Sequence, residues 1–249
     1  MGCQDGFKIE GDGVTEKIDW GKRSQKGYLA SGIDPADRGG RKNHYIDLLQ
    51  KTALAEVIDL KRDDVVLDFG CGSGRFSYWI APRVGKVIGL EITPEMIDLA
   101  EKNRTAQNVE FILYDGIHFP PLPSPVDLIL SVGVLQTVRG EVLEKTVLTL
   151  AGYLKSGGRC CLIEQATDNP GVDRPSVKEY LRTFERSNLV CLRYYPIRDG
   201  HWWLLYLIRY GIIPRTMLPG IARKEILCRR RKHKTISYYQ DHLFFVQKR

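Results

Sequence analysis

The sequence predicts an α/β protein built on a doubly wound, mostly parallel sheet. From residue 65 onward, short apolar runs alternate with segments of helical periodicity, and a cluster of glycines directly follows the first run. Apolar runs separated by helices are typical of parallel strands that helices cover on both faces. The chain has 249 residues, 43% hydrophobic and 27% charged, which excludes a disordered chain and allows a sizeable core.

The expected strands are short runs rich in Val, Ile, Leu and Phe that are bounded by turn residues. They cover residues 65–69, 86–92, 109–114, 127–132, 159–164, 189–195 and 237–247. Between the third and fourth runs, residues 120–125 contain four prolines and predict an irregular loop.

The expected helices have apolar residues at helical spacing or begin with a helix-starting residue. They cover residues 41–60, 76–84, 94–104, 141–155 and 177–187. Pro94 suits the first turn of the third helix, and Gly157 with Gly158 is expected to stop the fourth.

Two segments fall outside this alternation. Residues 1–40 are rich in Gly, Asp and Lys and predict an N-terminal arm ahead of a single domain at 41–249. Within that domain, an insert at about 198–232 separates the last two strands and is too long for a hairpin turn. Residues 193–249 carry 13 Lys and Arg against 3 Asp and Glu, so this last quarter supplies the basic excess of the chain.

The cysteines and the length of the apolar runs indicate in which cellular compartment the protein is expected. Six cysteines form no CxxC pair and have no histidine at zinc-ligand spacing, so neither a metal site nor a disulfide is expected. The longest apolar run, residues 202–208, is far shorter than a membrane span, and no secretory signal is recognised. The sequence therefore predicts a cytoplasmic protein with reduced thiols.

A nucleotide-like ligand is indicated by the turn after the first strand. Gly70, Gly72 and Gly74 follow that strand and precede a helix, so a ligand can approach the backbone closely. Glu91 ends the second strand and Asp115 the third, at the edge where open α/β sheets bind ligands. A dinucleotide fingerprint would need glycine at position 75, where arginine stands, and the P-loop lysine is absent.

Residues 65–74 resemble motif I of the class I S-adenosylmethionine-dependent methyltransferases. The similarity continues through residues 87–91, 114–116, 126–136 and 154–163. The resemblance implies a seven-stranded sheet whose last strand is antiparallel and inserted beside the sixth. It also implies S-adenosylmethionine as cofactor and S-adenosylhomocysteine as product.

The same resemblance implies a role for each residue of the predicted cofactor site. The glycine loop would lie against the methionine part, Asp68 would orient its amino group, and Glu91 would hold the ribose. Ile92 would pack near the adenine, Asp115 and Gly116 would meet its edge, and Ser131 would line the pocket near the sulfonium. The full expected set is Asp68, Gly70, Cys71, Gly72, Glu91, Ile92, Asp115, Gly116 and Ser131.

The sequence lacks two motifs that are typical of enzymes that methylate nucleic-acid bases, which reduces the number of possible acceptor classes. Residues 131–134 read Ser-Val-Gly-Val, without the Asn/Asp-Pro-Pro-Tyr motif of base amino methylation, and no Pro-Cys pair for cytosine-C5 chemistry occurs. An oxygen acceptor on a sugar, a lipid-linked intermediate or another small molecule is therefore expected. Such an acceptor is helped by a general base, for which Glu164 and His201 are the leading candidates and His44 a third.

Two alternative functions stay open: an RNA methyltransferase, and a non-catalytic S-adenosylmethionine-binding partner subunit. For residues 201–234, aromatic and then basic, three interpretations stand. The segment forms a lid over the acceptor, makes peripheral contact with an anionic membrane at the inner face, or binds nucleic acid, which is the least favoured partner.

Overall fold

The computed structural model describes residues 18–200, 202–231 and 238–249. Its centre is one seven-stranded sheet in the order β3-β2-β1-β4-β5-β7-β6. The strands are β1 (Val65–Phe69), β2 (Lys86–Glu91), β3 (Val109–Leu113), β4 (Val126–Val132), β5 (Leu154–Ala166), β6 (Leu189–Asp199) and β7 (Gln240–Lys248). Strand β7 is antiparallel to both β5 and β6, while β1 to β5 pair in parallel, which confirms the predicted topology.

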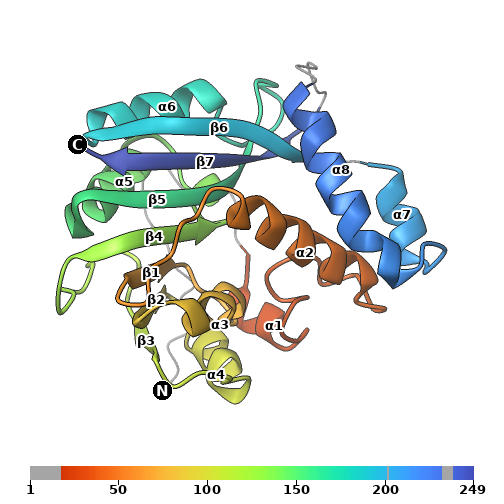
Figure 1. The fold of residues 1–249 in the computed structure, drawn as a ribbon, viewed down its shortest axis with the longest axis horizontal. Helices are drawn as coiled ribbons and strands as arrows, with labels where there is room; N and C mark the ends of the chain where they lie inside the picture. The colour runs from red at the N-terminus through yellow and green to blue at the C-terminus, as the bar shows by residue number, and fades with distance from the viewer. Residues whose placement is uncertain (1–17, 201, 232–237) are drawn as a thin grey trace.

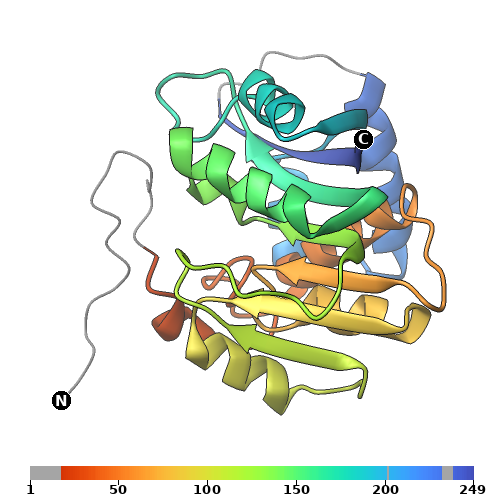
Figure 2. The ribbon, with the colours of Figure 1, turned by 90° about the vertical axis from the view of Figure 1, so that its left-hand side faces the viewer.

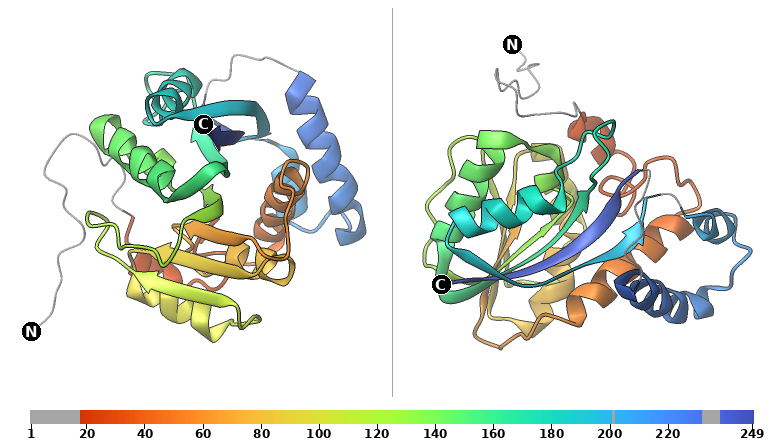
Figure 3. Two further views of the ribbon diagram at one scale, coloured as in Figure 1. Left: turned by 60° about the vertical axis from the view of Figure 1, so that its left-hand side comes forward. Right: turned by 90° about the horizontal axis from the view of Figure 1, so that it is seen from above.

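Helices cover both faces of this sheet (Figures 1 and 2). One face carries α2 (Arg41–Ala55), α3 (Arg75–Ile80), α7 (Leu204–Arg209) and α8 (Leu218–Arg231), whose buried side chains join one apolar core. The other face carries α5 (Gly140–Tyr153) and α6 (Val177–Arg186), which enclose the second core. The left view of Figure 3 shows α5 and α6 on one side of the strands and α2 with α8 on the other. Helix α4 (Pro94–Lys102) follows β2.

Side chains along each strand point alternately to the two faces of the sheet, so one strand contributes to both cores. In β5, Cys161 and Ile163 belong to the core under α2 and α8, whereas Cys160 and Leu162 belong to the core under α5. Successive side chains of a strand point to opposite faces, so a strand covered on both sides is apolar throughout. This is why the sequence shows continuous apolar runs here.

Several predicted boundaries differ from the structure. The first helix was expected to reach residue 60 but ends at Ala55, and the fourth ends at Tyr153 instead of 155. Leu154 adopts an extended backbone and pairs with Val126, so β5 begins before Gly157 and Gly158. These glycines therefore lie inside a strand and do not stop the helix.

Residues 18–40, expected as part of a loose arm, pack against the domain. They contain the short helix α1 (Trp20–Ser24), which contacts α4, and they bury Ser31 and Asp37. The insert after β6 forms α7, a short 3₁₀ turn at Arg215–Met217 and α8. Both helices pack on α2 at one end of the molecule (Figure 1). Among the described residues, no helix is long and apolar enough to cross a membrane.

Candidate cofactor and acceptor site

The glycine loop between β1 and α3 has the backbone form that only glycine adopts readily. Gly70, Gly72 and Gly74 have φ of 66°, 53° and 77°, in the left-handed region. At Gly70 a Cβ atom would also come within 2.4 Å of the Val134 side chain, which belongs to the turn after β4. Gly70 therefore allows two turns at the carboxyl edge of the sheet to touch.

Glu91 is tied to this loop by hydrogen bonds. Its Oε2 accepts from the Gly72 amide at 2.9 Å, and its Oε1 accepts from the amides of Ile92 and Thr93 at 2.8 and 3.0 Å. Burial raises the pKa of Glu91, and these amide donors counteract the rise. A carboxylate can accept about four hydrogen bonds, so Oε2 retains capacity for a ligand hydroxyl.

The surroundings of Asp68 and Asp115 shift the pKa values of these two carboxyl groups in opposite directions. Asp68 is buried at the end of β1, where Oδ2 accepts from the Ser77 hydroxyl at 2.6 Å, and burial raises its pKa to about 6. Asp115 is exposed beyond β3, and hydrogen bonds from the His118 side chain and from the His118 and Ile117 amides lower its pKa to about 2. Both side chains lie where strands β1 and β3 end, as predicted.

Glu164 is the most enclosed carboxyl group at this edge, with 1% of the residue exposed. Oε1 accepts from the Ser131 hydroxyl at 2.9 Å and from the Val134 amide at 3.3 Å, and Oε2 accepts from the Gln136 amide at 3.0 Å. Burial raises the pKa of Glu164 to about 7 despite these donors. The side chain thus connects β5 to the turn after β4.

The remaining predicted residues are distributed around these groups. Ile92 is partly exposed next to Glu91, and Gly116 has a φ of 81° next to Asp115. Cys71 is buried in the glycine loop, and Ser131 is fully buried with its hydroxyl directed to Glu164. Of the base candidates, His44 lies exposed on α2, whereas His201 lies outside the described residues.

Buried polar contacts that the sequence did not predict join helix α2 to the start of α3, directly after the glycine loop. Arg75, noted only as a departure from the dinucleotide pattern, is buried and donates to Asp47 at 3.0 Å and to Gln50 at 2.8 Å. The signal available was an arginine at the start of a short apolar helix, which needs a carboxylate partner if it is buried.

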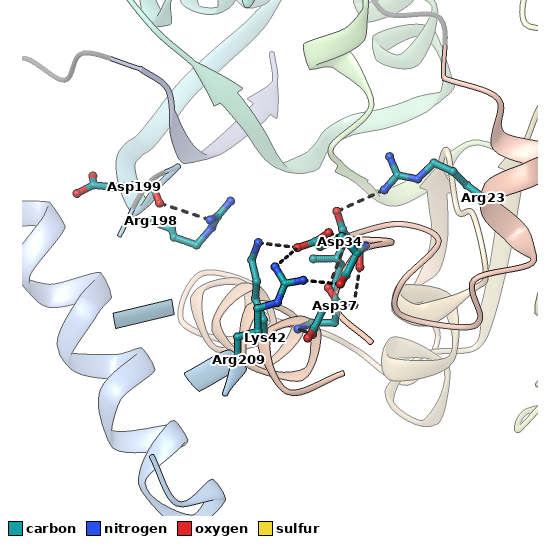
Figure 4. Close-up of polar contacts among 10 residues, drawn as sticks. Arg23, Asp34, Asp37, Lys42, Arg198, Asp199 and Arg209 are labelled. Carbon is teal, nitrogen blue, oxygen red and sulfur yellow. Dashed lines mark hydrogen bonds and ion pairs between the residues drawn. The ribbon is translucent and has the colours of Figure 1, made fainter. Parts of the chain in front are cut away.

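The N-terminal arm was also not placed in the site. Ser73 of the glycine loop donates to the Tyr28 carbonyl at 2.6 Å, so the arm lies against this loop. Asp34 of the arm receives ion pairs from Lys42 of α2 at 2.7 Å and from Arg209 of α7 at 3.8 Å (Figure 4). The arm therefore contacts the glycine loop, α2 and the insert.

Comparison with known proteins agrees with this geometry. Residues 66–158 match the family model described as a methyltransferase domain. Residues 66–158 therefore form a methyltransferase domain, and the seven-stranded sheet has the fold of S-adenosylmethionine-dependent methyltransferases. A Halobacterium salinarum arsenite methyltransferase is 32% identical over 186 residues, covering 69% of this chain and 44% of that protein. An uncharacterized RNA methyltransferase of Oceanobacillus iheyensis is 33% identical over 105 residues, covering 40% and 23%.

Among solved structures, one similar chain comes from the complex between the Haloferax volcanii Trm112 methyltransferase activator and a methyltransferase. The two structures superpose with a TM-score of 0.61 at 20% sequence identity, over 94% of this chain and 99% of that one, so they share the fold. The chain spans less than half the length of the two curated relatives described above.

The residues present fit the family's cofactor. Glu91 offers a buried carboxylate with remaining acceptor capacity, and the glycine loop leaves room for close approach to its backbone. Exposed Ile92 provides an apolar surface beside Glu91 on which a flat ring can pack. Within the described residues, no group of His, Cys, Asp and Glu suited to a metal ion is found.

Proposed function

We propose that this protein is an S-adenosylmethionine-dependent methyltransferase that methylates a hydroxyl oxygen of a sugar, a lipid-linked intermediate or another small molecule. The observation that carries the proposal is the glycine loop joined to Glu91 by the Gly72 amide. In this role Glu91 binds the ribose hydroxyls, Asp68 orients the amino group, and Asp115 contacts the adenine edge. When bound, S-adenosylmethionine supplies a methyl group already activated by its positive sulfur.

Because the donor is so reactive, the chain's own contribution is mainly positioning of the acceptor and exclusion of water. The turn after β4 is central to that task, since Val134 packs over Gly70 and Glu164 holds the Val134 and Gln136 amides. We assign Glu164 first to positioning this turn. Glu164 and His201 remain the proposed bases for removing the acceptor proton.

An oxygen acceptor is supported by the absence of the motifs for base methylation and of a Pro-Cys nucleophile. Methylation of RNA is the second candidate, and the match to an RNA methyltransferase over 40% of the chain favours it. A non-catalytic cofactor-binding subunit is opposed by the intact Asp68, Glu91 and Asp115. Peripheral contact with an anionic membrane agrees with a lipid-linked acceptor.

Transfer of a labelled methyl group into fractionated cell extract tests the proposal. Label from S-adenosylmethionine is expected in the lipid, polysaccharide or small-solute fraction, and Glu91→Ala should abolish it at low cofactor concentration. Label confined to RNA would replace the proposed acceptor by the second candidate. Tighter binding of NAD than of S-adenosylhomocysteine, measured by calorimetry, would refute the cofactor assignment.

A further inference from the structure

Three exposed aromatic side chains lie on helix α7 and at its two ends. Trp203, Tyr206 and Tyr210 are 68%, 59% and 75% exposed and are spaced by three and four residues, which places them on one side of the helix. On the opposite side, Leu205 and Ile208 are buried in the core.

The apolar surface continues into the segment that follows. Ile212 and Met217, between α7 and α8, are 65% and 55% exposed. The five exposed side chains Trp203, Tyr206, Tyr210, Ile212 and Met217 are together called the aromatic face. Single exposed apolar side chains are normal on soluble proteins, but five within fifteen residues indicate an interaction site.

The charged residues around the aromatic face indicate which kind of partner it binds. Between residues 202 and 231 the one acidic residue is Glu225, and it is buried, so every charged side chain that the described insert exposes is basic. Arg215, Arg223, Lys224 and Arg231 are exposed, and within the described part of the chain no carboxylate lies at ion-pair distance from them. These groups are complementary to an anionic surface.

The structure also shows that part of the basic cluster is not available for such contact. Arg229 pairs with Asp199 at 2.6 Å, and Arg230 pairs with Glu56 while its guanidinium lies 3.8 Å from the centre of the Tyr195 ring. These two side chains hold α8 to β6 and α2. Of the four basic residues that are unpaired among the described residues, Arg215, Arg223 and Lys224 precede this pair and lie closer in sequence to the aromatic face.

We propose that the aromatic face docks the protein onto a membrane rich in anionic lipid. Trp and Tyr favour the depth of lipid headgroups, and the bulky aliphatic side chains Ile212 and Met217 can enter the acyl boundary. Basic side chains at the same surface add attraction to anionic headgroups. Nucleic acid would use the rings for stacking but gives the aliphatic side chains no comparable partner.

Docking in this way would turn the site toward the bilayer. Helix α7 follows β6, whose carboxyl end lies at the same edge as the glycine loop, and Arg209 of α7 bonds the Ala36 carbonyl of the arm. The arm in turn contacts Ser73 of the glycine loop. This inference goes beyond the proposed function, because it holds for any acceptor and needs no turnover.

Co-sedimentation of the full chain with vesicles tests the proposal. Vesicles of phosphatidylcholine containing phosphatidylglycerol should pellet the protein at low salt, and rising salt should release it. Removing three basic side chains should weaken binding about a hundredfold, since each contributes about fivefold near such a surface. The test variants are Trp203→Ser/Tyr206→Ser/Tyr210→Ser and Arg215→Gln/Arg223→Gln/Lys224→Gln.

Matched variants control for general changes in surface. One removes two exposed apolar side chains from the edge strand β6, and the other removes three exposed lysines from α4, α5 and α6. They are Leu192→Ser/Tyr194→Ser and Lys102→Gln/Lys145→Gln/Lys178→Gln. Both controls should pellet like the unchanged protein, and thermal melts should show that all four variants are folded.

Four outcomes would overturn the proposal. The protein could remain in the supernatant at low salt, or bind vesicles equally well after loss of the three aromatic side chains. It could also bind single-stranded RNA through this face in filter binding while ignoring vesicles, which would assign the face to nucleic acid. A dimer in light scattering that the aromatic variant dissolves would assign it to a second copy of the chain.

Discussion

Replacing Glu164 by glutamine distinguishes a positioning carboxylate from a catalytic base. The carboxylate accepts three hydrogen bonds from Ser131 and from the amides of Val134 and Gln136. Glutamine keeps one acceptor oxygen and places an NH₂ group where the other oxygen was. At least one donor therefore loses its partner, at a cost of about 1.5–3 kcal/mol for a bond to a charged group.

A second effect acts in the opposite direction. The pKa of Glu164 is raised from 4.5 to about 7, which means that the buried charge costs about 3 kcal/mol relative to the neutral acid. Above pH 7 the glutamine variant avoids this cost, so the two effects nearly cancel in global stability. We expect the free energy of unfolding at pH 8 to change by no more than about 1.5 kcal/mol, while the turn at 131–137 loosens.

The local effect should appear in cofactor affinity, because this turn carries Val134 over Gly70. Calorimetry at pH 8 should show weaker binding of S-adenosylhomocysteine by about tenfold or more, equal to about 1.4 kcal/mol. In the unchanged protein the same affinity should fall as pH drops through about 7, when Glu164 is protonated and its O–H competes with the donors. In the variant this part of the pH dependence should be absent.

A purely catalytic role would give another pattern. As a base, Glu164 would leave S-adenosylhomocysteine affinity unchanged by the substitution and independent of pH near 7, while the turnover number fell. That result would refute positioning of the turn and return Glu164 to the role predicted from the sequence. Asp68 also titrates, at about 6, so the comparison is made between the two proteins at each pH.

Three further predictions test other parts of the site. Glu91→Ala should weaken S-adenosylmethionine binding by about 1.5–3 kcal/mol in calorimetry, and unchanged affinity would remove Glu91 from the site. Burial raises the pKa of Glu225 from 4.5 to about 7, so its stabilising contribution, complete below 4.5, is lost as pH rises through 7. Urea unfolding of Glu225→Gln should therefore depend less on pH between 5 and 8, by up to about 3 kcal/mol, and parallel curves would contradict this burial effect. Arg209→Ala should increase hydrogen exchange in the arm at residues 28–37, because Asp34 and the Ala36 carbonyl lose a partner, and unaltered exchange would show that α7 does not hold the arm.

The strands of the sheet were predicted well because each is indicated by the hydrophobic pattern of its own few residues. Each strand from β1 to β5 contains an apolar run. Asp68, Glu91 and Asp115 lie at the carboxyl ends of β1, β2 and β3, which meet at one edge of a parallel sheet. The position of β7 beside β6 came from the family resemblance, since no local pattern specifies a strand's neighbours. Boundaries were less accurate where glycines interrupt a strand instead of ending a helix, as at 157 and 158, where Gly157 has a φ of 72° inside β5.

What the sequence could not supply are contacts between distant segments. The bond from Arg75 to Asp47 spans 28 residues, and the pair of Arg209 with Asp34 spans 175. A charged residue gives no sign of its partner until the chain is folded, so Glu164 appeared as a free base although its oxygens accept three donors. Likewise, Arg229 and Arg230 belonged to a basic cluster in the sequence but are used inside the fold.

These distant contacts also explain why the arm and the insert act together. Two arginines hold the insert in place. Arg41 at the start of α2 donates to the carbonyls of Ile208 and Ile213, at 3.3 and 2.6 Å, and Arg209 of α7 pairs with Asp34 of the arm. Each contact is partly solvated and modest on its own, yet together they fix residues 208–213 relative to the start of α2 and the arm. The arm also touches the glycine loop through Tyr28, so a shift of α7 on docking would reach the cofactor site through residues already in contact. An acceptor held near the insert would stabilise this closed arrangement, and by linkage a bound cofactor would favour the same acceptor-binding state.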